Sequence, residues 1–441
     1  MPLNFPINPE PDMPEKTLQH FLQSTLALKP VQRLLVGFSG GLDSATLLHA
    51  LDKAGPDLPV LAIHVHHGLS PNADYWAQHA QAFCDARNIP LHIVRVTVGQ
   101  GASLEAEARA ARYAAFRLVL KAGDALLLAQ HRDDQAETVL FRLLRGAGVR
   151  GLGAMRAHAS LTVQEGFDVP VWRPWLGLSR RTLEHYARVE DLDWVEDESN
   201  IDTRYARNFL RQTVIPVLRQ HWPEAEKVLA ATAQRMQEAD ALLQEYALQL
   251  LEPLRLHRGA TSVGGLLALS SAQQKLLLRQ LIQENKLPLP SEKILEQISR
   301  DVLPAVNDAT PLLAWPGGEC RRYRDELHFM APLPDLPPFW QAYWQGGPLA
   351  LPDGRTLVAS SWPWADADVL VRYRQGGEKI MPAGQAHHRD LKTLMQENGM
   401  PPWERSRVPL VFVDGELVCV VGWWIAETAK GVLCELKYAG E

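Results

Sequence analysis

The stretch Arg33-Leu-Leu-Val-Gly-Phe-Ser-Gly-Gly-Leu-Asp-Ser44 decides the fold class, because it joins an apolar run to a loop of glycine and serine. The apolar run predicts a buried strand, and residues 43–53 have the apolar spacing of a helix. Glycine lets the backbone turn tightly and approach a ligand closely. A helix that starts directly after such a loop offers free backbone N–H groups to an anion. We therefore expect residues 39–44 to bind phosphate.

Strand and helix signals alternate after this loop. Strands are expected at residues 59–65, 91–96 and 124–129, and helices at 72–87, 103–121 and 133–145. Short apolar strands separated by helices are typical of a parallel sheet that is covered on both faces. The predicted fold class is therefore α/β, with a doubly wound, mostly parallel sheet in a catalytic domain at residues 1–220.

The pattern changes after about residue 215. The sequence predicts three further parts: a linker helix at 221–252, a small helical domain at 253–332 and an α+β domain at 345–441. A proline-rich stretch at 331–338 separates the last two parts. The helices expected at 270–285 and 291–302 each begin at a serine that can cap backbone N–H groups. Asp414-Gly415 predicts a hairpin turn in the last part.

The charge of the chain is uneven. Its 441 residues include 45 Lys and Arg and 51 Asp and Glu, which gives a formal net charge of −6. An acidic total argues against a nucleic-acid partner only if the charge is evenly spread. However, residues 142–181 hold seven arginines and two acids, residues 204–219 hold four arginines and no acid, and residues 372–407 hold seven basic and four acidic residues. Such local basic surfaces bind phosphates.

Cysteine usage and hydropathy point to a cytoplasmic protein. The four cysteines are scattered and form no C-x-x-C pair, which argues against a zinc site or a disulfide framework. The N-terminus lacks the basic and apolar regions of a signal peptide. The sequence has no run of 18 apolar residues, so no membrane partner is expected.

The loop after the first strand carries the most specific chemistry. The residues expected to bind the phosphates are Ser39, Gly40, Gly41, Leu42, Asp43 and Ser44. Asp43 is unusual there, because a carboxylate repels phosphate unless it coordinates a cation or caps the helix. The loop has no Walker pattern. It resembles the SGGxDS loop of the N-type ATP pyrophosphatases, and that resemblance implies cleavage of ATP between the α- and β-phosphates.

A second constellation, His131-Arg-Asp-Asp-Gln-Ala-Glu-Thr138, follows the strand expected at 124–129. The carboxyl ends of strands are where open α/β sheets bind ligands. Asp134 and Glu137 are three residues apart and share one helix face. Two carboxylates on one face hold Mg²⁺ or act as a base. Acids also gather at helix N-termini because of the helix dipole, which is the alternative explanation.

Two basic groups accompany these motifs. His64 and His66 lie on one face at the end of the strand expected at 59–65. No cysteine or acid follows at zinc spacing, so we favour polar groups near a nucleotide over metal ligands. Arg109 and Arg112 lie on neighbouring faces of the helix expected at 103–121, where solvated surface charges are the alternative.

Further blocks narrow the class of protein. These are RPWLGLSR, which starts at Arg173, and EDESNIDTRYARNFLR, which ends at Arg211. Together with SGGLDS, HVHHG, EAEARAARY and HRDDQAET, they closely resemble the long form of the bacterial tRNA(Ile)-lysidine synthetases. The resemblance covers residues 31–217. It continues in RYRQGGEKI and RDLKTLMQENGMPPWERSRVPLVF, which are similar to the family's terminal tRNA-binding domain.

The resemblance implies a ligase that converts the cytidine at wobble position 34 of the CAU anticodon of tRNA(Ile) to lysidine. The C2 oxygen of cytosine would attack the α-phosphate of ATP, and the amine of lysine would then attack C2. Pyrophosphate and AMP would leave in turn. ATP and Mg²⁺ are the implied cofactors, tRNA(Ile) and free L-lysine are the implied partners, and relatives suggest a homodimer.

The motif match also assigns roles to residues. It implies catalytic roles for Asp43, Asp134, Glu137 and Arg207, with Mg²⁺ at Asp43 and Asp134. It implies positions near the nucleotide or substrate for His64, His66, Arg109, Arg112 and His131. It implies tRNA contacts for Arg173, Arg204, Arg211, Arg389 and Lys392. Relatives often carry a second lysine where this chain has Thr393.

Three other functions fit the sequence less well. A sulfur-inserting tRNA enzyme of the same class typically needs paired cysteines, and this chain has none. A small-molecule adenylating synthetase of the glutaminase type often begins with a nucleophilic cysteine, which is also absent. A tRNA-binding protein without activity would not need intact SGGLDS and HRDDQAET motifs.

Overall fold

The computed structural model describes residues 13–99, 104–163, 166–306, 309–359, 361–429 and 434–438. The chain divides into two compact units, Met1–Leu242 and Leu243–Glu441.

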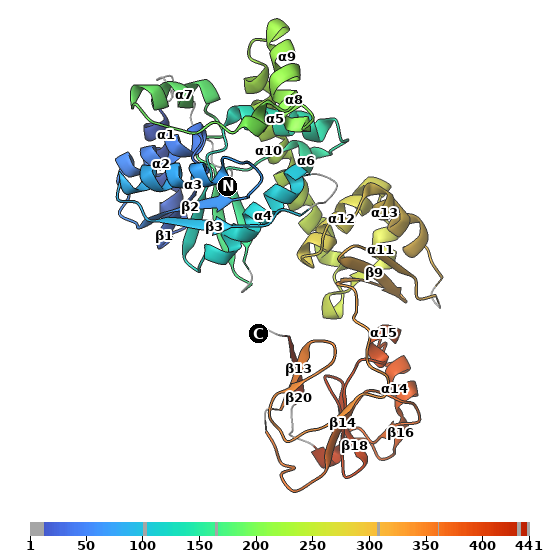
Figure 1. The fold of residues 1–441 in the computed structure, drawn as a ribbon. Helices are drawn as coiled ribbons and strands as arrows, with labels where there is room; N and C mark the ends of the chain where they lie inside the picture. Colours follow the sequence, from blue (N-terminus) through green and yellow to red (C-terminus); the bar gives the residue numbers. More distant parts are fainter. Residues whose placement is uncertain are drawn as a thin grey trace. The chain divides into compact units, whose positions relative to one another are not determined.

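A six-stranded sheet forms the centre of the first unit (Figure 1). Its strands are β1 (Arg33–Gly37), β2 (Val60–His66), β3 (Leu91–Arg95), β4 (Asp124–Leu127), β5 (His158–Thr162) and β6 (Asp168–Trp172). The spatial order is β3-β2-β1-β4-β6-β5, and only the β5–β6 pair is antiparallel. The prediction of a doubly wound, mostly parallel sheet is therefore confirmed.

Helices cover both faces of this sheet. They are α1 (Pro14–Leu28), α2 (Leu42–Ala54), α3 (Ala73–Asp85), α4 (Leu104–Val119), α5 (Arg132–Leu143), α6 (Val149–Leu152) and α7 (Arg180–Val189). Leu34 and Val36 of β1 pack in one core with α1, α2, α3 and α7, whereas Leu35 packs with Phe116 and Leu120 in a second core. The alternation of side chains along a strand thus separates the two cores.

The strand order creates a switch point between β1 and β4. The chain runs outward from β1 through β2 to β3 and then returns to β4 on the other side of β1. Because crossovers are right-handed, the return through α4 lies on the opposite face from α2 and α3. Open α/β sheets bind ligands at such a point, beyond the carboxyl ends of the strands. Residues 38–41 and 128–131 therefore lead the chain into the same crevice.

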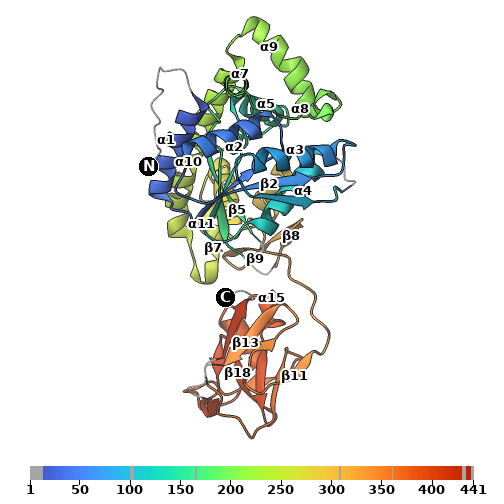
Figure 2. The same ribbon diagram turned by 60° about the vertical axis from the view of Figure 1, so that its left-hand side comes forward.

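The first unit ends in a helical run of α8 (Ala206–Phe209), a π-helical turn at Leu210–Val214, α9 (Ile215–His221) and the first part of α10 (Ala225–Leu251). In both Figure 1 and Figure 2, α9 projects from the rest of this unit. Pro216 lacks a backbone N–H group and its ring crowds the carbonyl of the preceding turn, so a regular α-helix cannot pass through it. The π-helical turn lies directly before this proline.

The second unit contains two separate hydrophobic cores. The first core belongs to α11 (Val263–Leu267), α12 (Ser271–Glu284), α13 (Glu292–Gln297) and a four-stranded sheet of β7 (Thr261–Ser262), β10 (Glu326–Met330), β9 (Gly318–Tyr323) and β8 (Leu312–Trp315). The middle domain, predicted as a small helical domain, thus contains a sheet besides its helices. Its strands are short and carry charged residues, so their pattern is weak. Ser270 caps α12 as expected, whereas Ser291 makes no capping hydrogen bond.

The second core belongs to the C-terminal part. A five-stranded sheet has the order β11 (Gln341–Tyr343), β14 (Val369–Arg372), β17 (Leu410–Val413), β18 (Glu416–Val420) and β19 (Trp424–Ile425). The smaller elements are β12 (Leu349–Ala350), β13 (Arg355–Ala359), β15 (Lys379–Ile380), β16 (Arg389–Asp390), β20 (Cys434–Tyr438), α14 (Leu391–Glu397) and α15 (Pro402–Arg405). Asp414 and Gly415 both have positive φ between β17 and β18, which confirms the predicted hairpin turn.

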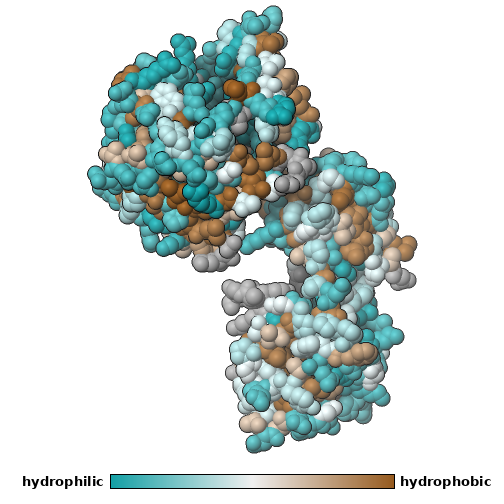
Figure 3. All heavy atoms as spheres, viewed as in Figure 1, coloured by the Kyte–Doolittle hydropathy of each residue, from teal (hydrophilic) through white to brown (hydrophobic). Residues whose placement is uncertain are grey.

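Hydrophilic residues cover most of the surface in Figure 3, and apolar residues form scattered clusters. Among the described residues, no helix is both long enough and apolar enough to cross a bilayer.

Asp124 at the start of β4 offers a test of the sheet. Its buried carboxylate accepts hydrogen bonds from Arg33 Nε at 2.9 Å, Arg33 Nη2 at 2.8 Å and the Lys121 N–H at 2.7 Å. Asp124→Ala should lower the free energy of unfolding by about 2–4 kcal/mol, because it leaves a partly buried guanidinium unpaired. Urea denaturation measures this. Glu184→Ala, which breaks an exposed pair with Arg188, should cost about 0.5 kcal/mol or less; equal losses would contradict this explanation.

Candidate active site

The loop after β1 is held in shape by its own serines. The Ser39 N–H donates to Ser44 Oγ at 3.1 Å, and the two hydroxyl oxygens lie 3.0 Å apart. The Ser44 hydroxyl donates to the Gly41 carbonyl at 3.0 Å, and the Gly41 N–H donates to Ser39 Oγ at 3.3 Å. These bonds wind residues 39–44 around the N-terminus of α2 before any ligand binds. The loop is therefore preorganised to receive an anion.

Gly40 fits its position only as a glycine. Its φ is +83°, and a Cβ atom there would lie 3.2 Å from Val195 Cγ2. The Gly40 carbonyl accepts a hydrogen bond from the Val195 N–H at 3.0 Å, so the acidic segment after α7 forms one wall of the loop. The predicted need for glycine thus has a backbone and a packing cause here.

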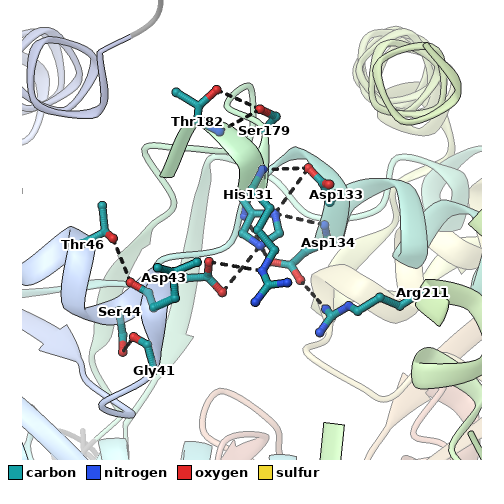
Figure 4. A network of polar contacts seen from close by, with 12 residues as sticks. Gly41, Asp43, Ser44, Thr46, His131, Asp133, Asp134, Ser179, Thr182 and Arg211 are labelled. Atoms are coloured by element: carbon teal, nitrogen blue, oxygen red, sulfur yellow. Dashed lines mark hydrogen bonds and ion pairs between the residues drawn. The ribbon is translucent and has the colours of Figure 1, made fainter. Parts of the chain in front are cut away.

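Asp43 points from the first turn of α2 toward the second constellation (Figure 4). Its Oδ2 lies 3.6 Å from His131 Nε2 and its Oδ1 lies 3.9 Å from Arg180 Nε. Burial alone would raise the pKa of Asp43, but the hydrogen bond and charge of His131, with the charges of Arg180 and Arg211, hold this pKa below its ordinary value. Asp43 is therefore an ionised carboxylate.

His131 is the central cation of the site. Its side chain is 1% exposed and lies 3.4 Å from Asp134 Oδ2 and 3.8 Å from Asp133 Oδ2. Burial would lower its pKa, but Asp134, Asp43 and Asp133 raise the pKa of His131 to about 9. The His131 Nδ1 atom is 3.5 Å from the Asp134 N–H, which is too long for a firm bond, so the ring is held by the carboxylates as an imidazolium.

Glu137 is paired with Arg211. Arg211 Nε donates to Glu137 Oε1 at 2.6 Å, and Arg211 Nη2 donates to Glu137 Oε2 at 3.0 Å and to Asp134 Oδ1 at 3.1 Å. The Glu137 side chain is only 3% exposed. Its burial raises the pKa of the carboxyl group, and Arg211 opposes that rise. The structure therefore brings Asp43, His131, Asp134 and Glu137 together, and adds Arg211, which we had expected at the tRNA.

Three arginines lie close to one another on α4 and α8. The charges of Arg109 and Arg207 lower the pKa of Arg112, as does its partial burial. Arg207 Nε also lies 3.2 Å from Glu105 Oε1. Nearby, His67 is held neutral, because burial and the charge of Arg112 lower its pKa to about 4.

The two histidines predicted near the nucleotide make internal contacts. His64 Nδ1 lies 3.0 Å from the Phe38 carbonyl oxygen, which steadies the strand end that leads into the loop. His66 Nε2 lies 3.1 Å from Asp74 Oδ1, and Arg95 donates to the same carboxylate oxygen at 2.8 Å. Both rings are buried. Their proximity to a nucleotide stays a prediction.

The residues predicted to contact tRNA differ in exposure. Arg173 is buried, and its guanidinium donates to Gln130 Oε1 at 2.9 Å and to the Arg156 carbonyl at 3.0 Å. We therefore correct this assignment, because the Arg173 guanidinium is bonded to other groups inside the first unit and is not exposed to a tRNA. Arg204 and Lys392 are exposed, and Arg389 is partly exposed beside Glu397.

Sequence reasoning missed two arginines of the site. Arg180 approaches Asp43, and Arg219 lies 3.5 Å from Asp133 and also pairs with Glu226. Their signal was present, since both lie in the basic stretches at residues 142–181 and 204–219. However, net charge along the sequence does not reveal which acid a side chain meets.

A divalent cation fits the Asp43 edge of the site. Asp43 Oδ1 is shielded from solvent and has no hydrogen-bond partner among the described residues. The part of the chain that the structure describes contains no group of three His, Cys, Asp or Glu residues suited to a metal. A Mg²⁺ ion at Asp43 and Asp134 would therefore take its remaining ligands from phosphate and water, as Mg²⁺ usually does.

The phosphate loop after β1 and the carboxylates after β4 define an ATP-utilising enzyme of the PP-loop class. Accordingly, a family model described as PP-loop domain matches residues 12–218. Models described as TilS substrate binding domain and TilS substrate C-terminal domain match residues 262–328 and 369–436.

Comparison with curated proteins identifies the family. The tRNA(Ile)-lysidine synthase of Methylococcus capsulatus is 40% identical over 92% of this chain and 94% of its own length. That of Pectobacterium atrosepticum is 38% identical over 96% of both chains. This chain therefore belongs to the tRNA(Ile)-lysidine synthase family.

Solved structures show more distant similarity. The U34-tRNA thiolase NcsA from Methanococcus maripaludis is 17% identical, with 51% of this chain and 78% of that chain covered and a TM-score of 0.42. A crystal structure of a TILS C-terminal domain is 20% identical, covers 23% of this chain and 98% of that chain, and has a TM-score of 0.19. Neither likeness is close enough to carry an argument.

Gly40→Ala should weaken ATP binding by about tenfold or more, because the methyl group meets Val195 and the residue must keep a positive φ. Equilibrium dialysis with labelled ATP measures the change. Gly55→Ala is the matched control: φ there is +54°, and a Cβ atom would have no neighbour within 4 Å. The Gly55→Ala variant should lose a similar amount of stability and keep its ATP affinity. If its ATP affinity fell as much as that of Gly40→Ala, backbone strain alone would explain the weaker binding of ATP.

Proposed function

We propose that this enzyme joins free L-lysine to C2 of the wobble cytidine, position 34, in the CAU anticodon of tRNA(Ile), and that it converts ATP to AMP and pyrophosphate. The observation that carries the proposal is the meeting of the serine-glycine loop with Asp43, Asp134 and Glu137 at one switch point. The relatives that span nearly the whole chain are named for this product.

In the first step, the C2 oxygen of cytosine attacks the α-phosphorus of ATP. The bond from this phosphorus to the bridging oxygen breaks, and pyrophosphate leaves against the backbone N–H groups of residues 39–44. We assign to Arg112 and Arg207, whose charges lie close to each other, the stabilisation of the negative charge that develops on the α-phosphate. Asp43 and Asp134 would hold Mg²⁺, which would supply further neutralisation of phosphate charge.

In the second step, the ε-amine of lysine attacks C2, and the bond from C2 to the adenylate oxygen breaks to release AMP. The amine must be neutral to attack, so an ammonium proton has to pass to a base. Asp134 and Glu137 lie on one face of α5 and are suited to bind the ammonium group and to accept this proton.

The exposed basic side chains are the proposed tRNA contacts. Arg204 is exposed beside Asp202, and Arg389 and Lys392 lie in the C-terminal part of the chain. We assign to each a contact with backbone phosphates, which position a nucleic acid without reading its sequence. A homodimer and a cytoplasmic location complete the proposal.

Cysteine burial favours this function over sulfur insertion. Cys84, Cys320 and Cys419 are all buried. Burial raises the pKa of Cys84 to about 12. Thiolate chemistry requires the opposite, namely an accessible thiol with a lowered pKa.

Asp43→Ala should abolish lysine transfer, because it removes the carboxylate that faces His131 and the expected cation. The assay follows labelled lysine into tRNA(Ile) transcripts in the presence of ATP and Mg²⁺. Asp52→Ala, on the exposed side of the same helix, should keep wild-type transfer. Wild-type transfer by Asp43→Ala would remove Asp43 from the mechanism, and a wild-type enzyme that transfers no lysine would refute the proposed function.

Removal of divalent ions should stop adenylation and leave the fold intact, since Mg²⁺ is placed among phosphates rather than in a protein cage. EDTA treatment followed by an assay of tRNA-dependent pyrophosphate release tests this, with circular dichroism as the folding control. Full release in excess EDTA would exclude the Mg²⁺ assignment.

A further inference from the structure

The two carboxylates assigned to lysine are already covered by a cation of the protein. Arg211 makes a two-pronged contact with Glu137, at 2.6 and 3.0 Å, and a third contact with Asp134 at 3.1 Å. A planar guanidinium that meets both oxygens of one carboxylate is a strong and directional arrangement. Each Glu137 oxygen therefore already accepts a hydrogen bond from an arginine N–H group.

Only one cation can occupy this position. Glu137 is almost fully buried, so its charge needs a partner within hydrogen-bond distance. Arg211 meets that need in the free protein, and the ammonium group of lysine would meet it in the complex. Both groups would use the same oxygens of Glu137 and Asp134. Simultaneous binding would also put two positive charges side by side, which costs free energy.

We propose that Arg211 occupies the ammonium site of lysine in the free enzyme, and that lysine binds by displacing it. This inference rests on the proposed function, because it takes Asp134 and Glu137 as the lysine carboxylates. It makes Arg211 a specificity-determining residue. A ligand must offer a cation that replaces the guanidinium on both carboxylates, so neutral amino acids cannot compete.

A tRNA phosphate is the new partner that we assign to the displaced Arg211 side chain. Arg211 is 36% exposed and lies in the π-helical turn between α8 and α9. From Thr203 to Pro223 the chain contains no acid, whereas Arg204, Arg207 and Arg219 lie in the same stretch. A polyanion is therefore attracted to this helical run. A tRNA phosphate that receives the Arg211 guanidinium would lower the cost of displacement.

Displacement links the two substrates. If tRNA draws Arg211 away from Glu137, tRNA tightens the binding of lysine, and lysine tightens the binding of tRNA by the same factor. Lysine would then bind firmly only when the tRNA that receives it is present.

Equilibrium dialysis with labelled lysine at pH 8 tests the proposal on the full-length protein, without ATP and with or without tRNA(Ile) transcript. For the wild type, tRNA should tighten lysine binding by about tenfold. Arg211→Gln keeps a hydrogen-bond donor near Glu137 but removes the charge. It should bind lysine about tenfold more tightly than the wild type in the absence of tRNA, and tRNA should add little.

Two further variants make the result specific. Arg211→Lys retains a competing cation and should stay close to the wild type. Arg188→Gln loses an exposed arginine of α7 that pairs with Glu184, outside the site, and should bind lysine like the wild type. Thermal unfolding checks that each variant is folded. If Arg211→Gln is not folded, Arg211→Met serves as the second neutral variant.

Weaker or unchanged lysine binding by the neutral variant would overturn the proposal, because Arg211 would then be a support for Glu137 rather than a competitor. Equal lysine affinity of the wild type with and without tRNA would overturn it too. Either outcome leaves the proposed function standing as long as the wild type transfers lysine to tRNA. Failure of that transfer would instead refute the proposed function itself.

Discussion

Asp43, Asp134 and Glu137 converge where β1 and β4 end, and carboxylates so close together stay ionised only if cations lie between them. His131 lies between Asp43 and Asp134, and Arg211 closes on Asp134 and Glu137. Each of the three carboxylates therefore has a resident cation beside it in the free protein. A cationic substrate or metal has to replace a resident cation or bring further negative charge with it, such as the phosphates of ATP.

The same pairing of carboxylates with cations explains why a carboxylate, Asp43, lies in a phosphate loop. The N–H and hydroxyl groups of residues 39–44 are neutral, whereas Asp43 is held ionised by His131. Phosphate and carboxylate repel each other unless a cation joins them, and in the proposed function Mg²⁺ is that cation.

The sequence predicted those parts of the structure that depend on local pattern. Apolar runs of four to seven residues and the SGGLDS loop indicated the sheet and the phosphate site, because burial and turn geometry act over a few residues. The pairing of Arg211 with Glu137 joins residues 74 positions apart, and no local pattern records it. Arg173 looked like a surface arginine, but Gln130 and the Arg156 carbonyl hold it inside. The middle sheet was missed because its short strands carry buried charged residues such as Glu319 and Arg322.

Phosphorus NMR of ATP turnover tests the central claim, that the loop and the carboxylates direct attack to the α-phosphorus. The reaction contains the full-length protein, Mg²⁺, lysine and tRNA(Ile) transcript, and the products are read from their phosphorus signals. The account predicts AMP and pyrophosphate in equal amounts, formed only when the tRNA is present. ADP and inorganic phosphate as the main products would contradict it, because the bond between the β- and γ-phosphates, rather than the bond between the α- and β-phosphates, would then have broken.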